Sequence, residues 1–313
     1  MVIARRKLAF SMLLLLMMCS LSGCVAPEDA STTETDSDAE PPTSEAYTLT
    51  TECVTMDGLE RCWLLLIPGN LSVENPVPLV LDLHGHGGTS EGQLNLSSFA
   101  DLAVSEGFIV AYPQGVDNFW GLGFNGVDND LDDIGFLAAV IDAVAAVHPI
   151  DTARVHMTGW SNGCMMTQRF MAEGPEVLAS AGCMAGYLMT DAPSTYTAPI
   201  PFMEVHGVLD ATVLYADNSW TAPFFQNDAG VNKGAVQNLE TWGDLNGCSG
   251  ALPEIYTQNA EYDIRGYSDC TSDAQVRLMS LYAVGHNPYL SGTGDGPPSS
   301  EIVWEFMAQF AKT

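Results

Sequence analysis

Short continuous apolar runs alternate along this chain with segments whose apolar residues recur at helical spacing. Continuous apolar runs bounded by glycine or proline are typical of strands buried on both faces of a parallel sheet. We predict strands at 47–53, 61–69, 76–85, 108–115, 153–159, 181–189, 200–207 and 275–285. We predict helices at 97–107, 132–149, 164–174, 234–247 and 299–312. This alternation through short loops predicts an α/β fold, with a mostly parallel, doubly wound sheet covered by helices on both faces.

The first residues have the pattern of a targeting signal and lie outside the predicted fold. A basic segment at 5–7 precedes an apolar run at 8–18, which is too short to span a bilayer comfortably. Leu21-Ser22-Gly23-Cys24 then resembles the lipobox of bacterial lipoproteins, which implies cleavage before Cys24 and a lipid on its thiol. An ordinary secretory signal is the alternative. We expect an exported bacterial lipoprotein of the cell envelope or cell surface, or one released to the extracellular space.

The remainder divides into a tether and one domain. Residues 24–46 are rich in Pro, Ser, Thr and acidic residues and lack large apolar side chains, so we predict a disordered tether. Residues 47–313 form one predicted domain without repeats. Of the whole chain, 47% is hydrophobic, which allows a substantial core without a partner, and we expect a monomer. The formal charge of −29 repels nucleic acid and anionic lipid, so we expect membrane contact only through the lipid anchor.

Six of the eight cysteines are candidates for disulfide bonds. Without Cys19 in the signal and the lipidated Cys24, six remain, and an even number in an exported domain suggests disulfides. Sequence order favours Cys53–Cys62 across an apparent hairpin and Cys248–Cys270, with Cys164–Cys183 left by elimination. The chain has no CxxC motif and no His/Cys cluster, so we expect no metal site and no cofactor.

The stretch Gly159-Trp160-Ser161-Asn162-Gly163 lies between a predicted strand and a predicted helix. Chemistry in doubly wound sheets is found beyond the carboxyl ends of the strands. Small residues on both sides of Ser161 allow the strained turn that presents a nucleophilic hydroxyl. A tight turn without chemistry is the alternative, but the strand before and the helix after favour a nucleophile.

A serine nucleophile needs a base and an acid, which in such folds follow it in the order acid, then histidine. Only His206 and His286 come after Ser161, and His286 follows the last predicted strand. Asp210 lies four residues beyond His206, in a loop suited to the acid, and Asp217 is its rival. We predict a triad of Ser161, Asp210 and His286, in which Asp210 fixes the tautomer of His286.

The third requirement is an oxyanion hole. The sequence LHGHGG (83–88) follows the first long buried strand, where backbone amides of the next loop can point toward the serine. We predict that the N–H groups of His86 and Asn162 bind the oxyanion.

Together, LHGHGG, DDIGF, TGWSNGCMM, VHGVLD, the Trp242…Asn246-Gly247-Cys248 pattern and the late Gly-His resemble the polyhydroxybutyrate depolymerase and feruloyl esterase group. The resemblance spans roughly residues 50–313. It implies the α/β-hydrolase fold and a secreted serine esterase that acts on polymer-linked esters. The chain departs from the group's pattern at Cys164, at Trp160 and at Asn287-Pro288. The last two departures flank the serine and the histidine and bear on the substrate.

Four residues are candidates for substrate binding: Trp160, Trp120, Trp220 and Asn287. Trp120 with Phe119 and Phe124, or Trp220 with Phe224 and Phe225, could form an aromatic wall for a sugar or phenolic ring. Aromatic loop residues also simply pack. The stretch DNDLDD (128–133) could suit calcium, but it lacks the glycine and closing glutamate of an EF-hand loop. We favour helix capping for it.

The sequence therefore predicts a serine hydrolase that cleaves carboxylic esters through an acyl-enzyme. Feruloyl or acetyl esters of plant polysaccharide rank close to polyesters of the poly(3-hydroxybutyrate) type as substrates. Two alternatives remain: a non-catalytic surface lipoprotein that uses the fold for binding, and a serine peptidase on the same fold.

Overall fold

The computed structural model describes most of the predicted domain. The described residues are 46–56, 58–71, 75–123, 130–189, 196, 198–216, 234–250, 252–289 and 299–312. The predicted signal peptide, Cys24, all of the predicted tether before residue 46, Asp217 and Trp220 lie outside them. Phe124, Phe224, Phe225 and residues 128–129 also lie outside them. No helix in these ranges is both long enough and apolar enough to cross a membrane.

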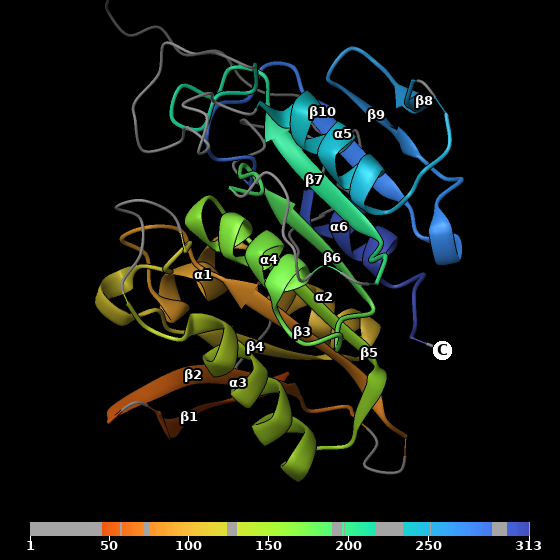
Figure 1. Cartoon of the computed structure of the whole chain (residues 1–313). Helices are drawn as coiled ribbons and strands as arrows, with labels where there is room; N and C mark the ends of the chain where they lie inside the picture. Colours follow the sequence, from red (N-terminus) through yellow and green to blue (C-terminus); the bar gives the residue numbers. More distant parts are fainter. Residues whose placement is uncertain are drawn as a thin grey trace, which may run out of the picture. The chain divides into compact units, whose positions relative to one another are not determined.

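One large sheet runs through the described part of the chain (Figure 1). Its strands are β1 (Tyr47–Met56), β2 (Leu59–Pro68), β3 (Val77–Leu83), β4 (Ile109–Pro113), β5 (Ile150–Gly159), β6 (Ser180–Met184), β7 (Phe202–Gly207), β8 (Glu254–Gln258), β9 (Tyr262–Tyr267) and β10 (Val276–Leu281). Their order is β1-β2-β4-β3-β5-β6-β7-β10-β9-β8. The six strands from β4 to β10 in this order are parallel, and antiparallel hairpins flank them on both sides.

Helices cover both faces of this sheet, as the alternation of elements predicts. They are α1 (Ser90–Leu96), α2 (Phe99–Glu106), α3 (Asp133–Val147), α4 (Asn162–Glu173), α5 (Ala235–Leu245) and α6 (Ser299–Met307). Helices α3, α4 and α5 lie in front of the sheet in Figure 1, and α2 and α6 lie behind it. The core on one face includes side chains of α3, α4 and α5, and the core on the other includes those of α2 and α6. In β3, Leu79 and Leu81 join the first core while Val80 joins the second, which explains why the run is apolar throughout.

Several elements differ from the prediction. Helix α1 was not predicted because its sequence, SEGQLNL, is mostly polar, and its start depends on a cap in which Thr89 Oγ1 accepts from the N–H of Gly92 at 3.0 Å. The β8–β9 hairpin was missed because β8 is exposed on both faces and shows no apolar alternation. Strand β6 ends earlier than expected, at Met184, because Ala185 has a φ of 57° and turns the chain while it stays buried.

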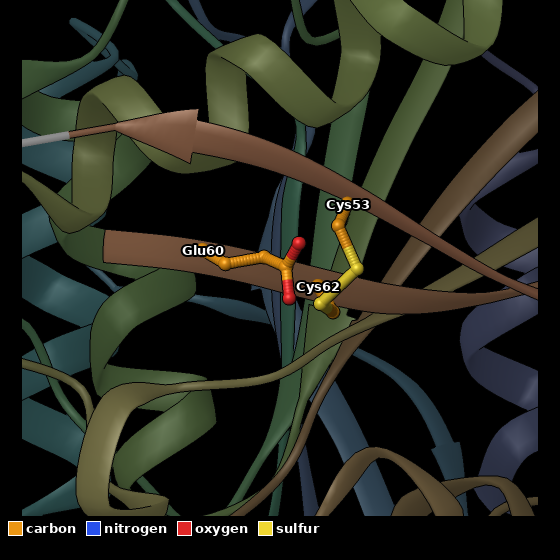
Figure 2. A group of neighbouring side chains, drawn as sticks. All are labelled: Cys53, Glu60 and Cys62. Carbon is orange, nitrogen blue, oxygen red and sulfur yellow. A yellow bond between two sulfur atoms is a disulfide. The ribbon is translucent and has the colours of Figure 1, made fainter. Parts of the chain in front are cut away.

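The structure forms the three disulfides that sequence order favoured: Cys53–Cys62, Cys164–Cys183 and Cys248–Cys270. Cys53 and Cys62 are directly opposite each other in the β1–β2 hairpin, and Glu60 points its carboxylate toward their bridge (Figure 2). This trio has the spacing of a metal-binding group. The two sulfurs are bonded to each other, however, and a metal requires thiolates, so the two cysteines form a structural cross-link.

Candidate active site

The nucleophile candidate lies at the sharp turn between β5 and α4. Ser161 has φ 55° and ψ −117°, a conformation rarely adopted by a residue with a side chain, which costs on the order of 1–3 kcal/mol. The flanking glycines are required by packing. A Cβ on Gly163 would collide with the carbonyl oxygens of Leu83 and His84, and one on Gly159 would lie 2.8 Å from the backbone of Gly163. The glycines therefore let α4 pack against the end of β3, which holds Ser161 at the carboxyl edge of the sheet.

The structure brings Ser161, His286 and Asp210 together, although 125 residues separate the serine from the histidine. Asp210 follows β7 and His286 follows β10, and these strands are parallel neighbours. His286 Nε2 lies 2.9 Å from Ser161 Oγ, and His286 Nδ1 lies 2.8 Å from Asp210 Oδ2. The chain of hydrogen bonds from hydroxyl to imidazole to carboxylate has the geometry needed to remove a proton from Ser161.

Asp210 is held as an anion by the donors around it. Its Oδ1 accepts from the backbone N–H groups of Thr212 and Val213 at 2.8 and 2.9 Å. Its Oδ2 faces His286, and also His206 Nε2 at 3.3 Å. Burial by itself raises the pKa of Asp210, but hydrogen bonds from His206 and His286 outweigh it and hold that pKa well below its usual range.

The loop after β3 is fixed by the ring of His84. His84 Nδ1 lies 2.8 Å from the carbonyl of Gly85, and Nε2 accepts from the N–H of Gly115 at 3.0 Å. This pattern requires the neutral imidazole, and burial lowers the pKa of His84 accordingly. Within the described ranges, the backbone N–H groups of His86 and Asn162 donate to no protein acceptor. They are thus available to a ligand, although their role as an oxyanion hole stays a prediction.

Trp120 does not form part of a substrate wall, and that prediction is wrong. Its side chain is fully buried in the core, and its indole N–H donates to the carbonyl of His84 at 3.0 Å. The side chain of Asn162 also binds it, accepting from the N–H of Trp120 at 2.8 Å and donating to its carbonyl at 3.0 Å. Trp120 therefore joins the loop after β3 to the first residue of α4.

The other substrate candidates and the acidic stretch have local partners. Trp160 is half-buried, and its indole N–H donates to the carbonyl of His286 at 2.8 Å. Asn287 Oδ1 accepts from the N–H of Tyr289 at 3.1 Å, within the turn after His286. Neither contact excludes a substrate. In the acidic stretch, Asp132 Oδ1 accepts from the N–H of Gly135 at 2.8 Å and caps α3, as we favoured over calcium.

Two residues behind Asp210 were not given a role from the sequence. His206 was considered only as an alternative base, and Glu204 was not considered. The structure buries both next to Asp210. A histidine two positions after a glutamate on one strand is the signal that could have found them, because residues i and i+2 of a strand share a face.

The chain has relatives among known esterases. No protein-family model matches it. Feruloyl esterase B of Piromyces equi is 24% identical over 254 residues, which cover 79% of this chain and 45% of that protein. Probable acetylxylan esterase A of Aspergillus flavus is 26% identical over 256 residues and covers 74% of this chain and 81% of that protein. The chain spans between 34% and 50% of the length of three curated relatives, the feruloyl esterase included.

Solved structures agree on the architecture. The acetyl xylan esterase from Aspergillus awamori superposes with a TM-score of 0.57 at 20% identity, over 83% of this chain and 99% of that chain. At this identity the similarity concerns the fold. Together with the central parallel sheet and its two helical layers, it shows that this chain has the α/β-hydrolase fold.

Proposed function

We propose that this protein is a serine esterase that hydrolyses carboxylic esters of plant polysaccharide, with feruloyl and acetyl groups as the acyl classes. The observation that carries the proposal is the hydrogen-bonded series Ser161–His286–Asp210 at the carboxyl edge of the sheet. The relatives named as feruloyl and acetylxylan esterases support the choice of ester.

The reaction follows from the contacts of these side chains. Ser161 Oγ attacks the ester carbonyl while His286 Nε2 takes its proton, and Asp210 stabilises the resulting imidazolium. The negative oxygen of the tetrahedral intermediate accepts from the N–H groups of His86 and Asn162. His286 then protonates the departing alcohol, which leaves an acyl group on Ser161. Water, activated by His286 in the same way, releases the acid.

The first experiment labels the full chain with a fluorophosphonate, with Ser161→Ala beside it. Labelling of the wild type alone is expected, because only an activated serine reacts. Labelling of neither protein would overturn the enzyme proposal in favour of a binding lipoprotein. A peptidase would cleave acylated peptides faster than the matching esters.

The acyl and alcohol groups are then identified on polymers. We expect ferulate or acetate release from arabinoxylan and acetylxylan by the wild type and not by Ser161→Ala. Hydroxybutyrate release from amorphous polyester, without either acid, would instead assign a polyester depolymerase. Turnover of a short nitrophenyl ester alone would retain the mechanism and reject both polymers.

We also propose that the protein is exported and anchored through a lipid on Cys24. The three disulfides support this, because such bonds persist in oxidising compartments. Metabolic labelling with palmitate should mark the wild type and not Cys24→Ala. Labelling of both proteins, or of neither, would overturn the anchor.

A further inference from the structure

A second acid–histidine pair is buried behind Asp210. Glu204 and His206 lie on the same face of β7 and are 1% and 0% exposed. Glu204 Oε1 lies 2.6 Å from His206 Nδ1, and His206 Nε2 lies 3.3 Å from Asp210 Oδ2. The series of polar contacts that begins at Ser161 thus continues past Asp210 into the core, through the ion-pair contact between Asp210 and His206.

Two acceptors near His206 determine that its Nε2 carries a hydrogen. Its Nε2 lies 2.8 Å from the carbonyl oxygen of Val213 and also faces the carboxylate of Asp210. Both are acceptors, so Nε2 must carry a hydrogen. The open question is the proton between Nδ1 and Glu204 Oε1, which makes the pair either carboxylate and imidazolium or carboxylic acid and imidazole.

The other oxygen of Glu204 has a fixed donor. Asn238 Oδ1 accepts from the N–H of Leu188 at 3.0 Å, which orients the amide. Its Nδ2 then donates to Glu204 Oε2 at 2.6 Å. Burial raises the pKa of Glu204, whereas the donors at both of its oxygens favour the carboxylate.

The stacked ring of Tyr187 and the carboxylate of Asp210 favour the cation. Tyr187 stacks on His206 with centroids 5.8 Å apart and planes at 12°, and Tyr215 meets it edge-on at 5.9 Å. An aromatic face attracts a cation. Burial lowers the pKa of His206, but hydrogen bonds with Asp210 and Glu204 outweigh burial and raise it to about 9. The hydroxyl of Tyr187 donates to the carbonyl of Leu214 and that of Tyr215 bonds to the hydroxyl of Ser280, so neither hydroxyl bonds to the imidazole.

We propose that Glu204 and His206 form a buried carboxylate–imidazolium pair whose role is to position Asp210 and to set the pH at which His286 becomes a base. His206 is a positioning residue, because it touches Asp210 and not the reacting atoms. The inference rests on the proposed function, since it assigns the pair to the triad of that function.

The charge on His206 changes the electrostatic environment of His286 in one direction. Around His286 lie Asp210, Ser161 and the ring of Trp160, of which Asp210 alone is charged. The carboxylate of Asp210 attracts a positive charge on His286, and a cation at His206 partly offsets that attraction. Loss of the His206 charge therefore strengthens the attraction between Asp210 and a cationic His286. The acidic limb of the kcat/KM profile should then move to higher pH, by about one unit.

The experiment uses the full chain with ¹⁵N-labelled histidine and reads the ring nitrogens by NMR. At neutral pH we expect both nitrogens of His206 at imidazolium positions, and a neutral Nε2–H tautomer in Glu204→Gln. A neutral His206 in the wild type would overturn the proposal. This readout needs no activity, so it stands apart from the fluorophosphonate test of the proposed function.

Activity provides the second readout, with nitrophenyl acetate as the probe. Glu204→Gln and His206→Gln should lower kcat more than they change KM and should move the acidic limb upward. The control, Glu305→Gln, makes the same chemical change at an exposed position on α6 and should leave the profile in place. Folded variants whose limb coincides with that of the wild type would overturn the role, and circular dichroism identifies which variants are folded.

Discussion

The indole N–H of Trp160 donates a hydrogen bond of 2.8 Å to the backbone carbonyl of His286. The residue before the nucleophile candidate therefore holds the loop of the histidine that faces it, and the two rings lie 5.4 Å apart. This contact links the turn of Ser161 to the loop of His286 without any contact with substrate.

Trp160→Phe should test this contact, because it removes the donor and retains an aromatic ring. We expect about a tenfold loss in kcat, and a loss of about 1 kcal/mol in the free energy of unfolding for the missing hydrogen bond. Steady-state kinetics and urea unfolding measure the two effects. An unchanged kcat together with a raised KM would instead assign Trp160 to substrate binding.

Asp210→Asn should reduce kcat by roughly 10⁴-fold, because an amide can present a donor to Nδ1 and favour the wrong tautomer of His286. The backbone donors of Thr212 and Val213 face the side chain in either case, so the fold should remain. Kinetics on a nitrophenyl ester, with Ser161→Ala as the inactive reference, gives the ratio. Activity near that of the wild type would transfer the role of the acid to another carboxylate.

The disulfide Cys164–Cys183 should stabilise the protein more than Cys248–Cys270 does. Their sequence separations are 19 and 22, so loop entropy gives each about 3 kcal/mol. Cys164 and Cys183 are also fully buried between α4 and β6, where two alanines would leave a cavity. Thermal melting of the two double Cys→Ala variants compares them. Equal melting temperatures, or free thiols in the unfolded wild type, would contradict this expectation.

Asp82 should make stability fall as pH rises. Burial raises its pKa to about 7, and hydrogen bonds from Ser97 and Gln93 only partly offset that effect. The folded protein then holds a proton that the unfolded chain releases near pH 4, so between these values rising pH costs up to about 4 kcal/mol. Urea unfolding across this range should show a smaller pH dependence for Asp82→Asn than for the wild type. Identical slopes would show that Asp82 ionises normally.

The sequence predicted the central strands and the meeting of Ser161, Asp210 and His286, because each follows a strand whose carboxyl end is marked by a glycine or a polar residue. The sequence did not show that Trp120 is buried and does not face a ligand. A tryptophan in a loop gives the same local sequence signal in both cases. Trp120 is buried because Asn162 and His84 bind its polar groups, and such long-range partners leave no local signal.

The pair behind Asp210 was missed for a related reason. Glu204 and His206 interrupt an otherwise apolar strand. The sequence pattern shows that polar groups are buried there, but it does not show which residues contact them. The answer depends on Asn238 and Tyr187, which come from α5 and from the segment after β6. Short polar elements such as α1 were missed because their stability comes from a cap and from packing.

The disulfide between Cys53 and Cys62 also fixes the register of an edge strand. Strand β1 forms an outer edge of the sheet and carries an exposed Leu49, and such edges invite pairing with a second copy. A slip of one residue would turn every side chain of the strand to the opposite face, and the bridge between directly paired positions prevents that slip. The same covalent bond therefore keeps the register of this edge strand fixed, and with it the set of side chains that the strand exposes.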